Sequence, residues 1–163
     1  MGHKKYITSY DVQQLQVLKL ESGFAHYSQN EDMKQYEYMI LGDMRSVEES
    51  KRTFVASRQG CLSKDPIRNL KYMFAISTGL ASRYVVEAGL PIKIAYSISD
   101  LYMQKMDELT TVEEITELHH EMYAHYTKEM QKIRKQNALS RPVSQCIEYI
   151  DSHLNEHLTL AVL

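Results

Sequence analysis

The chain has only two cysteines, Cys61 and Cys146, which lie far apart and lack metal-type spacing. This pattern excludes a disulfide framework and makes a reducing cytoplasm the expected location. No apolar run approaches the roughly 18–20 residues that a membrane span requires, and no signal-peptide core is visible, so no membrane partner is expected. The net charge is only −2 at pH 7. Bulk electrostatics therefore do not make these residues a nucleic-acid binder.

Sequence motifs for catalysis are missing as well. The chain contains no nucleophile motif, no glycine-rich phosphate loop and no carboxylate pair whose placement can be inferred. We therefore predict that it is not an enzyme, and we assign no catalytic residue and no cofactor. His119-His120-Glu121 with His125 suggests zinc, but His120 and His125 are five residues apart, so their imidazoles diverge around a helix. We expect a solvated polar helix face there and no metal.

The composition is that of a soluble globular protein. The 163 residues are 44% apolar and 25% charged, which is enough for one domain with its own core. Within residues 1–30, Gln14-Leu-Gln-Val17 alternates like a strand, while Val12, Leu15 and Leu18 fit one helical face, so the sequence leaves this segment open. Between residues 30 and 137, apolar residues recur at helical spacing. The prediction is an all-α fold, a bundle of about five helices.

The first three of these helices have recognisable ends. The first begins at Asn30 and is closed by Gly42. The second begins at Ser46-Val-Glu-Glu49, which has the pattern of a capping box. The third covers residues 64–88 and is apolar almost all round from Met73 to Val86. A helix of that kind belongs at the centre of a domain, so we expect no solvated face on it.

The longest helix is expected to begin at a second capping box, Thr111-Val-Glu-Glu114, and to end at about Asn137. Its apolar positions recur with a period of 3.6 residues, which favours packing on a globular core over a coiled-coil seam. The stripe consists of Val112, Ile115, Leu118, Met122, Tyr126, Met130 and Ile133. A basic cluster at 128–135 complements the negative helix end. Residues 136–141 are the expected boundary between this domain and the C-terminal segment.

Six residues of the domain are candidates for contact with a ligand or with the C-terminal segment. These are Arg68, Lys71, Arg83, Tyr84, Tyr96 and Tyr102. Arg83 lies within the apolar helix, where a buried charge needs a partner, so a salt bridge to Glu87 or Asp100 is the simpler expectation. Arg68 and Lys71, near the start of that helix, are expected to be more exposed. An effector pocket would lie between this helix and its neighbours, lined by Arg83 and the three tyrosines, and the sequence names no ligand.

The C-terminal residues form a second apolar pattern. Ser140 is a good N-cap, and Pro142 suits the first turn of a helix. An apolar stripe then runs through Val143, Ile147, Ile150 and Leu154. After a polar turn, residues 158–163 begin a second helix that is cut off after one turn. We therefore expect the chain to be a fragment of a longer protein.

This stretch resembles the entry to the DNA-binding domain of the AraC/XylS family of bacterial transcription regulators. In that family the opening helix usually has a Tyr-Ile pair and then a His, as in Tyr149-Ile150 and His153. A turn and a helix of the type Leu-Ser/Thr-Leu come next, as in Leu158-Thr-Leu160. The resemblance covers about the last twenty-two residues. It implies that one set of residues forms the core of a truncated helix-turn-helix: Ile147, Ile150, Leu154, Leu158 and Leu160. Residues 65–102 are also similar to the helical regulatory segment of some Gram-positive members.

The resemblance implies a division of the chain and a set of partners. Residues 1–138 would be the regulatory or dimerisation domain, and residues 139–163 the linker and first helix of a truncated DNA-binding domain. Both recognition helices are missing, so the parent would bind DNA through a C-terminal domain that this chain lacks. A homodimer and an unidentified small-molecule or protein effector are further expected partners.

An alternative interpretation needs no resemblance. The stripe that begins at Val143 would then be the last helix of the bundle, packed on the long helix, and the chain would be a protein–protein interaction module. Removing the residues from about 139 onward separates the two interpretations. Loss of a bundle helix would destabilise the core, whereas loss of an appended unit would not.

Overall fold

The computed structural model describes residues 6–21, 29–54 and 60–152. All regular structure within these ranges is helical, so the predicted all-α class is confirmed. The helices are α1 (Ser9–Glu21), α2 (Gln29–Ile40), α3 (Arg45–Thr53), α4 (Pro66–Glu87), α5 (Ile92–Glu108) and α6 (Val112–Ser152). The segment left open between strand and helix therefore contains a helix, α1. Among the described residues, no helix is long and apolar enough to cross a membrane.

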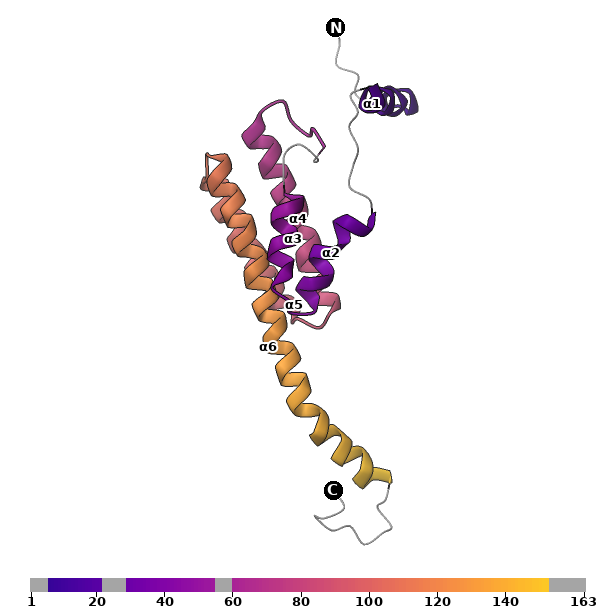
Figure 1. The fold of residues 1–163 in the computed structure, drawn as a ribbon, viewed down its shortest axis with the longest axis vertical. Helices are drawn as coiled ribbons and strands as arrows, with labels where there is room; N and C mark the ends of the chain where they lie inside the picture. The colour runs from indigo at the N-terminus through magenta and orange to yellow at the C-terminus, as the bar shows by residue number, and fades with distance from the viewer. Residues whose placement is uncertain (1–5, 22–28, 55–59, 153–163) are drawn as a thin grey trace.

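Helices α2 to α5 gather around the N-terminal half of α6 (Figure 1), and α6 contacts each of the four. The shared core is built from large apolar side chains that are fully buried, among them Met39, Phe74, Ile115, Met122, Tyr123 and Tyr126. In contrast, α1 makes no contact with any other described helix and stands apart from the bundle (Figure 1). The core therefore belongs to α2–α6.

Helix α4 lies in the middle of the bundle, but one of its faces is open. The helix begins where Asp65 caps it, since the Asp65 carboxylate accepts from the backbone N–H of Arg68 at 3.0 Å and Pro66 takes the first position. The expectation of no solvated face is wrong, because Tyr72, Ile76 and Leu80 are 43–51% exposed. They lie one turn apart, opposite the buried side of α4, and no other described helix covers them.

The turn between α2 and α3 corrects one predicted cap. Gly42 closes α2 as expected, with a φ of 71°. Ser46, however, does not cap α3. It lies in the first turn and is fully buried, because its hydroxyl bonds across the core to Thr127 at 2.6 Å. The second predicted box is present, since the backbone N–H of Glu114 donates to the Thr111 hydroxyl at 3.3 Å and that hydroxyl donates to the Glu114 carboxylate at 2.7 Å.

Helix α6 is longer than the sequence indicated. It continues to Ser152, so the expected end near Asn137 is wrong, and residues 136–141 lie inside the helix. Ser140 and Pro142 are therefore not the start of a new helix. No glycine follows Gly89 in the chain, so the usual residue for ending a helix is missing. The helix continues through Pro142 although an interior proline removes a backbone hydrogen bond and crowds the preceding turn. The alternative in which the stripe from Val143 folds back onto the bundle is also wrong for residues 143–152.

Candidate functional site: helix α6 and the groove beside α3

Polar contacts fix α6 to its neighbours at buried positions. Thr127 bonds to Ser46 of α3, and its hydroxyl also donates to the carbonyl of Tyr123 at 2.7 Å. The Tyr126 hydroxyl donates to the carbonyl of Ala95, on α5, at 3.0 Å. Each of these bonds lies within the core, where an unmade hydrogen bond is costly. The N-terminal half of α6 is therefore held in one register against α3 and α5.

His119 is an ionisable group that is fully buried in this contact. Its Nε2 lies 2.9 Å from the Ser77 hydroxyl on α4, which in turn lies 3.1 Å from the Tyr123 hydroxyl. Its ring stacks on Phe54, with 3.7 Å between ring centroids. Burial, and to a lesser degree His120, holds the pKa of His119 well below its ordinary value. The expected solvated face is wrong for His119, which is a neutral core residue linking α3, α4 and α6.

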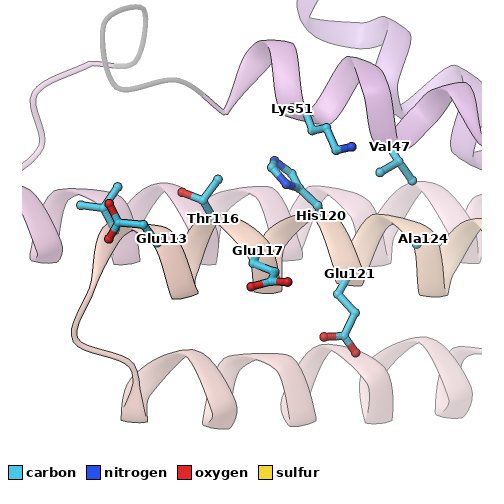
Figure 2. Close-up of a pocket in the computed structure, with 9 residues that line it drawn as sticks. Val47, Lys51, Glu113, Thr116, Glu117, His120, Glu121 and Ala124 are labelled. Carbon is cyan, nitrogen blue, oxygen red and sulfur yellow. The ribbon is translucent and has the colours of Figure 1, made fainter.

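His120 faces a different environment, an open groove between α3 and α6. The groove has a volume of about 720 Å³. Figure 2 shows the His120 ring directed toward α3, whose residues Lys51 and Val47 line the opposite side of the groove. Burial, and then the charge of Lys51, lowers the pKa of His120. Its Nε2 is shielded from solvent without a hydrogen-bond partner among the described residues, so the groove contains a neutral imidazole.

Carboxylates line the same stretch of α6. Glu113, Glu117 and Glu121 border the groove at four-residue spacing. Figure 2 shows Glu121 directed away from α3, toward a neighbouring helix. There it accepts a hydrogen bond of 3.3 Å from the hydroxyl of Tyr102, which also lies 3.3 Å from Nδ1 of His125. Burial, and then Glu121, raises the pKa of Tyr102.

The histidine-rich segment does not converge on one point. His119 faces the core, His120 faces α3, and His125 faces Tyr102 of α5. Within the described part of the chain, no group of three or more His, Cys, Asp or Glu side chains could hold a metal ion. The groove thus presents one neutral imidazole and a row of carboxylates to anything that binds beside α6.

The C-terminal half of α6 extends beyond the other helices of the bundle (Figure 1). Among the described side chains of α6, Ile133 is the last that packs against the core, and residues 134–138 are all exposed. Figure 1 shows this half running away from the other helices toward the C-terminus. At 1.5 Å per residue, the part from 134 to 152 is about 28 Å long. We call this part, residues 134–152, the arm.

The charged members of the predicted contact set lie at separate places on α4. Arg83 pairs with Glu87, one of its two expected partners, at 2.7 Å, and the pair lies on the exposed surface of α4. Lys71 donates to the carbonyl of Asp107 at 2.7 Å and so caps the C-terminal end of α5. Arg68 is exposed, as expected.

The three tyrosines of that set also face different surroundings. Tyr84 stacks on Tyr36 of α2, with 4.9 Å between ring centroids. Tyr102 is buried against α6, and Tyr96 is 47% exposed on α5. None of the six predicted residues lines the groove. The structure therefore does not bring them together as one site, and it adds His119, His120 and Lys51, which the prediction of contacts did not include.

The predicted core of the helix-turn-helix start is described only in part. Ile147 and Ile150 lie in the arm, and the side chain of Ile150 is half-buried. Leu154, Leu158 and Leu160 lie outside the described residues. The turn and second helix expected there remain predictions.

Comparison with protein-family models, with curated proteins and with solved structures finds no match to the chain. The proposed function therefore rests on the site and on the C-terminal residues themselves.

Proposed function

We propose that this chain is the regulatory part of a DNA-binding transcription regulator that resembles the AraC/XylS family. In this proposal the bundle α2–α6 controls where a C-terminal double helix-turn-helix domain lies. One observation carries the proposal: a single helix, α6, belongs to the core at one end and to the arm at the other. The arm contains the first residues that carry the resemblance, among them Tyr149 and Ile150, so bundle and DNA-binding unit would share one rigid element.

A shared helix converts small changes in the bundle into displacements at its far end. The first half of α6 is fixed by Thr127, Tyr126 and His119 to three neighbouring helices. If a ligand or partner in the groove tilts α6 by about 5°, the end of an arm about 28 Å long moves by roughly 2.5 Å. Phosphate and base contacts are sensitive to displacements of that size.

Two further features are compatible with a regulatory rather than a DNA-contacting role for these residues. The net charge is −2, and the groove is lined by glutamates, both unfavourable for contact with phosphates. In this proposal, sequence reading belongs to recognition helices placed in the major groove by the C-terminal domain of the parent. The 163-residue chain alone should therefore show no sequence-specific DNA binding.

The test has a genetic and a biochemical part. The coding sequence is read for about a hundred codons past Leu163, where the proposal expects two helix-turn-helix patterns with Arg- or Lys-bearing second helices. The protein encoded by the whole frame and the 163-residue chain are then each used to select sequences from random duplex DNA at about 150 mM salt. The longer protein should enrich a discrete site and the shorter chain none. A stop codon shortly after Leu163, or an operator-specific shift with the 163-residue chain, would refute the proposal.

The second candidate is a protein–protein interaction module. It is favoured by the groove beside α3 and by the open apolar face of α4. In that case the arm would have no DNA-binding unit to position. Neither the protein encoded by the whole reading frame nor the 163-residue chain would then enrich a DNA site.

A further inference from the structure

A cluster of exposed cations lies in the interior of α6, where the arm begins. Its members are Lys128, Lys132, Arg134 and Lys135. The sequence suggested that this cluster complements a negative helix end, but α6 continues to Ser152. The effect of a helix end is confined to its last turn. That explanation is therefore wrong, and the cluster calls for another.

Three of these cations share one face of the helix. At 100° and 1.5 Å per residue, Lys128, Lys132 and Lys135 lie within about 60° of one another and span about 10.5 Å along the axis. They are nearly opposite to Tyr126 and Met130, which are buried in the core. We call these three residues the lysine face. While one side of α6 packs on the bundle, the lysine face is open on the other.

The charge of the lysine face is largely unbalanced. Lys132 pairs with Glu129, but its side chain stays 66% exposed, and an exposed pair of this kind contributes little. Lys128 and Lys135 form no ion pair with any residue that the structure describes. Like charges three and four residues apart on a helix repel one another. An anionic partner would therefore stabilise this face.

The outer side of α6 changes sign along the helix. Glu113, Glu117 and Glu121, which border the groove, have a mean direction within about 30° of that of the lysine face. They precede it along the chain, on the half of α6 that lies in the bundle. A polyanion is therefore repelled beside the groove and attracted where the arm begins.

We propose that the lysine face contacts the phosphates of duplex DNA, beside the site that the C-terminal domain of the parent reads. This inference rests on the proposed function, because DNA as the partner presupposes a DNA-binding parent. The spacing fits, since about 10.5 Å corresponds to about three base-pair steps of one strand at 3.4 Å each. Phosphate contacts position a protein without reading sequence. The 163-residue chain alone therefore still selects no DNA site.

The first test measures binding of the 163-residue chain to a fluorescent duplex of random sequence by anisotropy. Three phosphate contacts give a slope of about −2.7 in log K against log salt, so the affinity should fall about 40-fold between 50 and 200 mM salt. Combined Lys128→Gln, Lys132→Gln and Lys135→Gln should abolish this salt-dependent binding. Arginine at the same three positions should preserve it, because the charge is kept. Both replacements are good helix formers, so the melting temperature should not change.

The matched control removes the same charge elsewhere. Lys64, Arg68 and Lys93 are exposed, and their combined replacement by glutamine should leave the salt slope unchanged. Equal weakening by the two triple variants would show an effect of net charge alone and would overturn the proposal. So would a wild type that does not bind the duplex at 50 mM salt with a Kd below about 1 mM. Tighter binding to polyglutamate than to the duplex, at equal charge concentration, would assign the face to an acidic protein instead.

The second test uses the protein encoded by the whole reading frame. The three glutamine substitutions in the lysine face should weaken binding to its enriched site and to random duplex by the same factor, and should reduce the salt slope by about 2.7. An enriched site with an unchanged salt slope would overturn this inference and leave the proposed function standing. The absence of any enriched site would refute the proposed function itself.

Discussion

Mild acid should destabilise the bundle through His119. The side chain is 1% exposed, stacked on Phe54 and bonded to Ser77, and burial holds its pKa well below the ordinary value of about 6.5. In the unfolded chain His119 titrates near that ordinary value, so as the pH falls the unfolded state takes up the proton first. The contribution of neutral His119 to stability is therefore complete well above pH 6.5 and is lost as the pH falls through that value.

The expected magnitude comes from this linkage. While the unfolded state is protonated at His119 and the folded state is not, stability falls by about 1.4 kcal/mol per pH unit. Between pH 7.5 and pH 5.5, the loss from this residue is therefore about 1.4 kcal/mol, roughly three quarters of it below pH 6.5. For a domain of this size, that corresponds to a decrease of about 4 °C in melting temperature.

The assay compares the wild type with His119→Gln by urea and thermal unfolding at pH 7.5, 6.5 and 5.5. Glutamine is polar but does not titrate, whereas His120 and the carboxylates are the same in both proteins. The difference between the two pH dependences therefore isolates His119, whatever the absolute stability of the variant. Equal pH dependences for the two proteins would refute the assignment of His119 as a buried neutral residue.

Three further predictions concern the contacts of α6. Gly42→Ala should lower the free energy of unfolding, measured in urea, by about 2–3 kcal/mol, because φ is 71° and the added Cβ would lie 2.9 Å from Cγ of Gln131. A decrease below about 0.5 kcal/mol would contradict this expectation. Thr127→Val should lower the free energy of unfolding by about 1–3 kcal/mol, because the buried Ser46 hydroxyl loses that partner. Adding Ser46→Ala to this variant should recover part of the loss. If the effects of the two substitutions on the free energy of unfolding simply add, the pairing is contradicted. A chain that ends at Ala138 should have a melting temperature within about 2 °C of that of the full chain, because the described core packing of α6 ends before that residue. A melting temperature about 10 °C lower would contradict this prediction.

The periodic parts of the fold could be predicted from the sequence. The stripe of the longest helix is buried as expected at Ile115, Met122 and Tyr126, since a helix with one apolar face must bury that face. Val112 is the exception, because it lies at the very start of α6, where it is 46% exposed. Helix spacing is a local property, so a short window of sequence is enough to show it.

The polar core could not be predicted in the same way. His119 lies four residues after Ile115, on the buried stripe of α6, so its position in the helix indicated burial. The adjacent polar residues His120 and Glu121 favoured the interpretation as a solvated face instead. Its partner Ser77 lies 42 residues away on another helix, and no local pattern connects the two. The same holds for Ser46. Its sequence pattern predicted a helix cap, but its hydroxyl bonds instead to Thr127, 81 residues further along the chain.

The length of α6 was missed for a different reason. Ser140 and Pro142 are favourable at a helix start, and a proline inside a helix costs about 3 kcal/mol, yet α6 continues through both residues to Ser152. The candidate site depends on this difference, because α6 runs without a break through residues 136–141, where the boundary between the two parts of the chain was expected. Its connection to the bundle comes from tertiary contacts, which spacing alone does not specify.

The central claim is that α6 is one rigid helix from the core to the end of the arm. Spin labels at Val112→Cys and Val143→Cys, in a chain with Cys61→Ser and Cys146→Ser and diluted with unlabelled protein, measure it by pulsed electron paramagnetic resonance. A continuous helix separates the two backbone positions by about 47 Å. The account predicts a narrow distance distribution near that value. A broad distribution centred well below about 40 Å would show a break at residues 136–141 and would contradict the account.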